Sequence, residues 1–455
     1  MPELYQLDLD IITVFSLFFS GLIFLPIIIK IFKNLSIKKY LINDIFILLM
    51  YITFIIRPLM KYYLDIEVFY FDLTSSTVFE VNLLFTISMM IYLLGYNMFS
   101  SKYIPKINKN YVYVLNNRVF IALFIGISIS LLSYLVMIYT YEGSLSLNNI
   151  INFIKPSRKA LSNSGISSYI IQFTIIIQYL TVLYIIIKKE FNYTAIFLIL
   201  LTFIILLSLG GRMQLILFIL TLFFINQLYL KPIKIIKLLV YGYFILLLLA
   251  IFPIIRSLVS SDIELDDVMV RTALRFLGKD EFNMLILPFF PFIYIITGDV
   301  TSIWDMFSGL YQHIHPFNDI EWGRFISQFF TMPIPRSLYT DKPIALGTYF
   351  SQYFEQVTSR GVSLGLLGEL YWSFSFFGTF IGSFIFGLII SFFDKLYLKN
   401  KYNSFIILNH SILLSFTILF YRSPMSTVVK YIFFIIIAFT ILFLARRKNE
   451  KIINT

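Results

Sequence analysis

The chain has 455 residues, of which 59% are hydrophobic and 13% are charged, and its formal net charge is +11. This composition excludes a set of soluble domains, because long apolar runs recur along the chain and a membrane span needs about 20 apolar residues. The absence of cysteine excludes disulfides, thiolate nucleophiles and cysteine-ligated metals. We therefore expect an all-α protein, a polytopic bundle of transmembrane helices.

Eleven apolar segments are predicted to span the membrane, and in chain order they are residues 11–32, 41–60, 78–99, 119–139, 168–187, 194–209, 213–230, 236–255, 364–393, 404–420 and 427–445. The first span follows an acidic stretch that contains Glu3, Asp8 and Asp10. No basic region precedes it, so we interpret it as an uncleaved span and not as a signal peptide.

Basic residues set the predicted orientation of these spans. They cluster in six connections or tails, at residues 30–39, 102–118, 188–189, 231–237, 395–401 and 446–451. All six clusters fall on the cytoplasmic side only if the N-terminus is outside and the C-terminus inside, as the positive-inside rule requires. The net positive charge is therefore mostly this bias, and it does not indicate a nucleic-acid partner.

One outer segment, residues 256–363, is much longer than most other connections. Its stretch 285–297 is apolar, but it is too short to span and contains Pro288 and Pro291, so we expect it to be interfacial or re-entrant. The sequence predicts three parts. Residues 1–255 form spans one to eight, 256–363 form an outer cap of short interfacial helices, and 364–455 form the last three spans and a basic tail.

Arginine and lysine are distributed unequally across the predicted membrane. The inner side carries 17 Lys and 3 Arg, whereas the outer side carries 10 Arg and 6 Lys. The planar guanidinium group suits phosphate and carboxylate better than the ammonium group of lysine does. The outer face is therefore predicted to bind an anion.

Four of the outer arginines precede the N-termini of predicted spans, and they are Arg158, Arg212, Arg360 and Arg422. The helix dipole disfavours a cation at such an end by about 0.3–1 kcal/mol. A bound phosphate or pyrophosphate would reverse this sign, because the helix N-terminus and the arginine would then act together. For any single arginine, a side chain that reaches into solvent or toward a carboxylate is an equal alternative.

Two glycine-containing segments add candidates. Gly210 and Gly211 permit a tight turn that leaves Arg212 at the outer boundary. Further on, Gly365 and Gly368 share one helix face, as in close helix packing, and Glu369 follows them inside a predicted span. A carboxylate in a span is costly, so Glu369 is either a general base for a sugar hydroxyl or a partner of an arginine.

Histidines and aromatic residues of the outer loop are weaker signals. His313 and His315 belong to no Asp, Glu and His set with ligand spacing, so no metal is expected, and we interpret them as loop residues, with acid–base chemistry as the alternative. Some outer aromatic rings could stack on sugars, and these are Tyr311, Trp322, Tyr339 and Tyr349.

Together with the topology, three segments resemble the bacterial O-antigen and capsular-polysaccharide polymerases of the Wzy type. They are Gly210-Gly211-Arg212, the segment 334–338 with Asp341-Lys342-Pro343, and residues 365–371 leading to Phe376-Phe377-Gly378. The resemblance covers roughly residues 200–380. The chain departs from it after Tyr371, where Trp-Ser-Phe-Ser stands in place of an Asn-Phe-Gly-like stretch.

The resemblance implies a glycosyltransferase of the bacterial cytoplasmic membrane without a cofactor, which joins undecaprenyl-pyrophosphate-linked oligosaccharide repeat units on the outer face and releases undecaprenyl pyrophosphate. In this scheme the catalytic residues are Arg212, Arg360, Glu369 and His313. The residues that bind substrate are Arg336, Arg158, Arg256, Arg422 and Lys342. Its implied partners are the lipid-linked oligosaccharide, the bilayer, a chain-length regulator and a flippase of the same pathway.

Two alternatives stay open. A flippase or permease for an anionic lipid-linked glycan would also need internal arginines, although along a cavity open to both leaflets. A ligase-like transferase would share the large outer loop and its arginines but deliver the glycan to a different acceptor.

Overall fold

The computed structural model describes most of the chain outside the long connections. The described residues are 4–5, 9–36, 40–63, 68–69, 71–106, 111–113, 117–144, 168–208, 212–228, 230, 243, 303–314, 319–331, 334, 339, 341, 343–344, 346–354, 362–401, 403–422, 436, 440 and 446–448.

The described residues are overwhelmingly helical, which confirms the predicted fold class. The strands within them have two or three residues and form two antiparallel pairs. The strand β1 (Leu4–Tyr5) pairs with β2 (Val68–Phe69), and β3 (Tyr111–Tyr113) pairs with β4 (Arg446–Lys448). Each pair joins two segments that the predicted topology places on the same side of the membrane, so the pairing agrees with the predicted alternation of spans.

The chain divides into two compact units. The described helices of the first unit are α1 (Ile11–Ser36), α2 (Ile42–Tyr51), the π-helix η1 (Ile52–Ile56), α3 (Arg57–Tyr63), α4 (Ser75–Met98), α14 (Ile303–His313), α15 (Arg324–Thr331), α16 (Leu346–Phe354) and most of α17 (Gly365–Lys399). Those of the second unit are the 3-10 helix η2 (Ser101–Tyr103), α5 (Asn117–Glu142), α8 (Ser168–Lys188), α9 (Tyr193–Ser208), α10 (Arg212–Leu228), the end of α17 and most of α18 (Ser404–Arg422). Each unit thus combines segments that are distant in sequence, and the three sequential parts predicted above remain a prediction.

Apolar helices coincide with nine of the eleven predicted spans. Six described helical segments are long and apolar enough to cross a bilayer, and they are Ile11–Leu35, Ile42–Tyr63, Ser75–Met98, Asn117–Thr140, Gly365–Lys399 and Phe405–Arg422. Three further apolar helices, within α8, α9 and α10, are shorter. The predicted spans 236–255 and 427–445 lie outside the described residues. The fold is that of a helical membrane protein.

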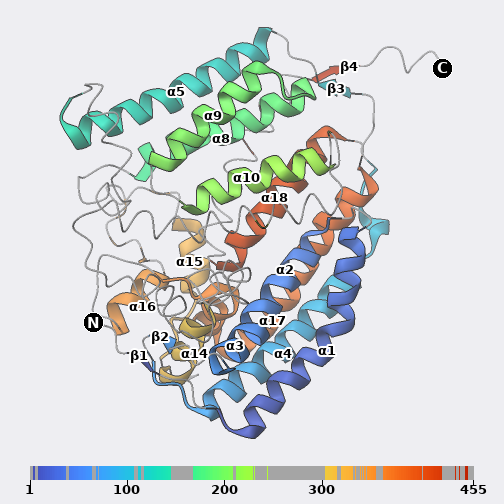
Figure 1. Ribbon diagram of the computed structural model, residues 1–455, viewed down its shortest axis with the longest axis vertical. Helices are drawn as coiled ribbons and strands as arrows, with labels where there is room; N and C mark the ends of the chain where they lie inside the picture. Colours follow the sequence, from blue (N-terminus) through green and yellow to red (C-terminus); the bar gives the residue numbers. More distant parts are fainter. Residues whose placement is uncertain are drawn as a thin grey trace, which may run out of the picture. The chain divides into compact units, whose positions relative to one another are not determined.

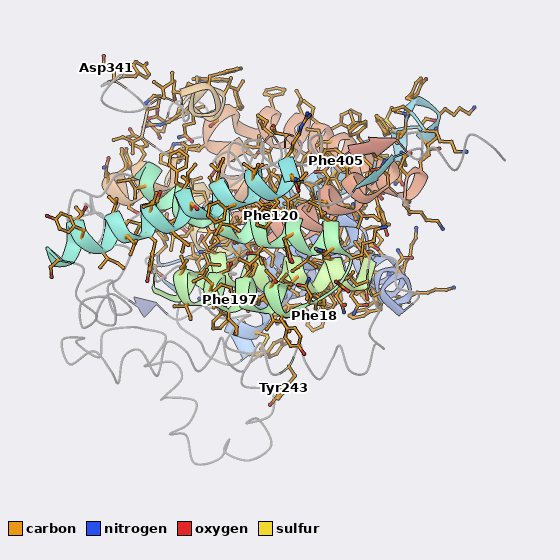
Figure 2. The ribbon with its side chains drawn as sticks, turned by 90° about the horizontal axis from the view of Figure 1, so that it is seen from above. Phe18, Phe120, Phe197, Tyr243, Asp341 and Phe405 are labelled. Carbon is orange, nitrogen blue, oxygen red and sulfur yellow. The ribbon has the colours of Figure 1, made fainter. Side chains whose placement is uncertain are left out.

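Exposed apolar side chains explain why these helices suit a bilayer. Phe18 of α1 is 49% exposed, Phe120 of α5 58% and Phe197 of α9 62%. Figure 2 shows these labelled side chains on their helices. On α1 the exposed apolar residues recur every three or four positions, which forms one continuous face. In lipid such a face needs no protein cover, because acyl chains are as apolar as leucine.

In the first unit, α1, α2, α4 and α17 lie side by side, with α14 beside β2 and η1 (Figure 1). Two glycines let α4 and α17 approach closely. A methyl group at Gly387 would collide with the carbonyl oxygen of Tyr92, and one at Gly95 would collide with that of Phe384. Small residues serve this purpose in membrane helices generally.

Gly387→Ala is therefore expected to lower the free energy of unfolding by about 1–3 kcal/mol, since a backbone oxygen cannot move aside as a side chain can. Gly21→Ala is the matched control. Its added methyl group would meet only side-chain atoms, 3.3 Å from Ile55 and 3.5 Å from Tyr51, so a change below about 1 kcal/mol is expected. Thermal unfolding in detergent measures both, and equal melting temperatures would contradict the close crossing.

Candidate functional site

The helix α17 is broken at Ser375. The backbone of Ser375 has φ 57° and ψ −153°, which is not helical, and Gly382 lies next to the side chain of Leu370. Twelve residues along a straight helix would separate these two by about 18 Å. Residues 365–374, here called the half-helix, therefore fold back against the longer part of α17. The predicted ninth span, 364–393, is not one straight helix at its outer end.

Loop residues satisfy the backbone groups at this break. The amide of Glu321 donates to the carbonyl of Trp372 at 3.0 Å, and the amide of Gly323 donates to the carbonyl of Ser373 at 3.4 Å. The indole of Trp372 donates in turn to the carbonyl of Asp319 at 3.2 Å. Irregular backbone in a membrane protein needs such partners. The break falls within Trp-Ser-Phe-Ser, the stretch where the sequence departs from the Wzy-type pattern.

The helix α14 lies beside the half-helix and runs parallel to it. Gly365 packs against Ile303, Gly368 lies opposite Phe307, and the ring centroids of Tyr311 and Tyr371 are 5.3 Å apart. Most of α14 is buried, so this short helix from the long segment 256–363 is inserted into the first unit and does not lie flat on its surface. The glycines Gly365 and Gly368 serve this close contact.

A buried ionic triad fixes α14. The guanidinium of Arg57 donates to both carboxylate oxygens of Asp305, from Nε at 3.0 Å and from Nη2 at 2.8 Å, and Lys61 Nζ donates at 2.9 Å. All three side chains are fully buried. Burial alone would raise the pKa of Asp305, but the charges and hydrogen bonds of Arg57 and Lys61 lower it below its ordinary value. The carboxylate therefore stays ionised at neutral pH.

The sequence analysis did not identify this triad, although part of its signal was present. Arg57 and Lys61 are four residues apart at the end of the second predicted span, so they share one helix face. Charges in a span usually have a buried partner. The partner could not be named, because Asp305 is 244 residues from Lys61 in the chain.

A cavity of about 400 Å³ lies where α4, α14 and the half-helix meet. Its lining is polar and aromatic, and the lining residues are Glu80, Tyr311, Gln312, His313, Ile314, Asp319 and Tyr371. Tyr311 and Glu80 line the cavity together. Burial, and then the nearby Glu80 carboxylate, raise the pKa of Tyr311, so it stays protonated as a donor. Such a lining can hold a ligand rich in hydroxyl groups.

Two further contacts hold the end of α14 at this cavity. Gln312 Nε2 donates to the carbonyl of Asp72 at 2.8 Å, and its Oε1 accepts from the amide of Thr74 at 3.4 Å. The ring of His313 lies 5.3 Å from that of Phe71 and 5.9 Å from that of Phe354. The polar groups are thus presented by ordered helices.

No family model, curated protein or solved structure matches this chain. The resemblance to the Wzy-type polymerases therefore remains an expectation from the sequence.

Of the predicted catalytic and substrate-binding residues, the structure places one at the cavity and others away from it or outside the described part of the chain. His313 lines the cavity, whereas Glu369 is buried in the half-helix and does not line it. Both belong to the first unit. Arg212 begins α10 in the second unit, as predicted for the start of a span, and only its backbone is described. The predicted residues that lie outside the described part of the chain are Arg158, Arg256, Arg336, Lys342 and Arg360.

Arg422 lies at the end of a described helix, and the span 427–445 that it was predicted to precede lies outside the described residues. Arg422 is the last residue of α18, and its Nε donates to Ser363 Oγ at 3.3 Å. The C-terminus of a helix is locally negative and stabilises a cation. The position of Arg422 therefore needs no bound anion to explain it.

The aromatic residues predicted to stack on sugars also lie in different surroundings. Tyr311 lines the cavity, while Tyr349 contacts the guanidinium of Arg324, 3.9 Å from its ring centroid, and the ring of Trp372 at 5.3 Å. Tyr349 is thus part of a side-chain cluster. Trp322 is 66% exposed and is the more accessible surface for a sugar ring. Within the described residues, no group of three or more His, Asp or Glu side chains could hold a metal ion.

Asp305→Asn is expected to lower the free energy of unfolding by about 3–5 kcal/mol, because it removes the negative charge that both buried cations contact within 3 Å. Lys61→Met keeps the paired contact between Arg57 and Asp305 and should cost far less. Asp72→Asn, at an exposed position, is the control. Thermal unfolding in detergent measures the three variants, and similar losses for Asp305→Asn and Asp72→Asn would refute the anchoring role.

Ser375→Gly is expected to raise the free energy of unfolding by about 1 kcal/mol, because a side chain in this backbone region costs about 1–3 kcal/mol. Ser375→Ala keeps the Cβ atom and should bring no gain. In the helical half of the same segment, Ser373→Gly should instead lower stability by up to about 1 kcal/mol. Thermal unfolding in detergent compares the three variants. A lower melting temperature for both Ser375→Gly and Ser373→Gly would contradict the strained backbone at Ser375.

Proposed function

We propose that this protein is a glycosyltransferase that polymerises lipid-pyrophosphate-linked oligosaccharide repeat units on the outer face of the bacterial cytoplasmic membrane. The observation that supports this best is the cavity, in which carboxylate, phenol, imidazole and amide groups meet within an otherwise apolar helical bundle. These groups are natural partners of sugar hydroxyls. The volume of about 400 Å³ is in the usual range for small-ligand sites.

The proposed reaction uses energy that the substrate already carries. A hydroxyl group of one glycan attacks the anomeric carbon of another, the bond from that carbon to the phosphate oxygen breaks, and the pyrophosphate leaves with the electron pair. Arg212, Arg360 and Arg336 are the proposed donors to the leaving group, with Arg158, Arg256, Arg422 and Lys342 as secondary ligands. Fixed donors aimed at a developing charge are among the strongest catalytic devices.

The base would be His313 or Glu369. His313 lines the cavity and is exposed, so it could exchange a proton with solvent. Glu369 is 7% exposed and lies two residues before Tyr371, which lines the cavity.

Transport is the second candidate function. A flippase for an anionic lipid-linked glycan would require a cavity lined by basic groups. The described lining of this cavity contains two carboxylates and neither lysine nor arginine, which favours transfer over transport. A ligase-like transferase would use the same chemistry on a different acceptor, and only the acceptor separates it from a polymerase.

A deletion strain of the source organism, complemented with wild-type protein or with Arg212→Ala or Arg360→Ala, tests the proposal. We expect deletion and both variants to abolish the polymer ladder while single repeat units still reach the outer leaflet on lipid. Arg118→Ala, at an exposed position, is the control and should leave the ladder normal.

Polymer length by gel electrophoresis and protein amount by immunoblot are the measurements. Repeat units trapped on the inner leaflet would instead identify a flippase, and an unchanged ladder after deletion would refute the proposal.

A further inference from the structure

Glu80 is a cavity residue that the arginine scheme does not use. It lies in the second turn of α4, is exposed, and shares the cavity with the phenols of Tyr311 and Tyr371. In the sequence it lies near the start of a predicted span, like many other carboxylates at membrane boundaries, so nothing there distinguishes it.

The surroundings hold Glu80 in place. The start of α4 is fixed by hydrogen bonds from the amide of Thr77 to Thr74 Oγ1 at 3.3 Å and from the amide of Asp10 to Ser75 Oγ at 2.8 Å. Tyr311 lines the same cavity as the carboxylate, and its ring packs against that of Tyr371. A carboxylate on a capped helix, in a cavity walled by packed phenols, is preorganised.

The charge of the cavity determines which ligand it can take. Glu80 and Asp319 contribute negative charge, and no lysine or arginine is among the described lining residues. A bound anion would lie close to these two carboxylates and be repelled by them, so a pyrophosphate or an acidic sugar is disfavoured here. A neutral sugar fits the hydrogen-bonding groups, and a protonated amino sugar also gains attraction. The site that holds the pyrophosphate must then be a different one.

We propose that this cavity is the subsite for the terminal sugar of the acceptor chain, a neutral or amino-bearing sugar, and that Glu80, in place of His313 or Glu369, accepts the proton of its attacking hydroxyl. This inference rests on the proposed function. The hydroxyl oxygen forms a bond with the anomeric carbon of the donor, the bond from that carbon to the pyrophosphate breaks, and the proton moves to the Glu80 carboxylate. The carboxylate then releases the proton to solvent, to which it is exposed.

Glu80→Gln and Glu80→Asp in the deletion strain test the role of the carboxylate. Glu80→Gln is nearly isosteric and should reduce polymer by about 100-fold or more, whereas Glu80→Asp should retain part of it. Glu190→Gln, at an exposed position of the second unit, is the matched control and should be normal. The melting temperature of the purified variants checks the fold, and a normal ladder from a folded Glu80→Gln protein would overturn the assignment.

Probe binding tests the subsite without relying on polymerisation. Purified full-length protein in nanodiscs is titrated with methyl glucoside, methyl glucosaminide and methyl glucuronide in mildly acidic buffer, where the amine is protonated. By saturation-transfer NMR we expect the glucosaminide to bind best and the glucuronide worst. Glu80→Gln should reduce the preference for the glucosaminide over the glucuronide about fivefold, the effect of one charge in a hydrated site.

The complementation and binding experiments distinguish failure of the sugar subsite from failure of the proposed polymerase function. An equal affinity for the glucosaminide and the glucuronide in wild-type protein, or an unchanged preference in Glu80→Gln, would overturn the subsite. If the preference behaves as expected but deletion leaves the polymer unchanged, the sugar site stands and the proposed polymerase function fails, together with the proton transfer to Glu80.

Discussion

The contact of Asp305 with Arg57 and Lys61 holds the first unit in its functional arrangement. It joins α14 to α3 through fully buried charges. Burying three charges is expensive, and their close mutual geometry offsets the desolvation. The same geometry leaves α14 little freedom, because a shift of this helix would separate opposite charges in a medium of low dielectric constant. The residues at the far end of α14, Tyr311 to His313, are therefore presented at a fixed place.

The break in α17 provides the opposite wall of the cavity. A continuous helix would carry Tyr371 away from α14, whereas the fold at Ser375 returns it to lie beside Tyr311. Gly378 and Gly382 allow the two parts of α17 to touch, and loop amides bind the carbonyl groups next to the break. The strained backbone of Ser375 is tolerated because the surrounding contacts hold it in this conformation, as is common at functional sites.

The proposed reaction fits separate binding sites for the acceptor sugar and for the donor pyrophosphate. A cavity of acidic and aromatic character suits the hydroxyl-bearing acceptor, while the arginines predicted on the outer side suit the pyrophosphate of the proposed donor. Separation of the two is physically sensible, because a carboxylate close to the departing pyrophosphate would oppose its growing charge.

The sequence by itself determined the helical membrane class, nine apolar segments that coincide with described helices, and the start of a helix next to Arg212. These follow from hydropathy, which is a local property of the chain. It also singled out His313, which lines the cavity, and Gly365 and Gly368, which serve close packing. Only the tertiary structure decided that Asp305 pairs with Arg57 and Lys61, that α17 folds back at Ser375, and that Glu80 faces Tyr311. Each of these depends on contacts between residues far apart in the chain, or on a backbone break that an apolar run does not reveal, and hydropathy contains no information about either.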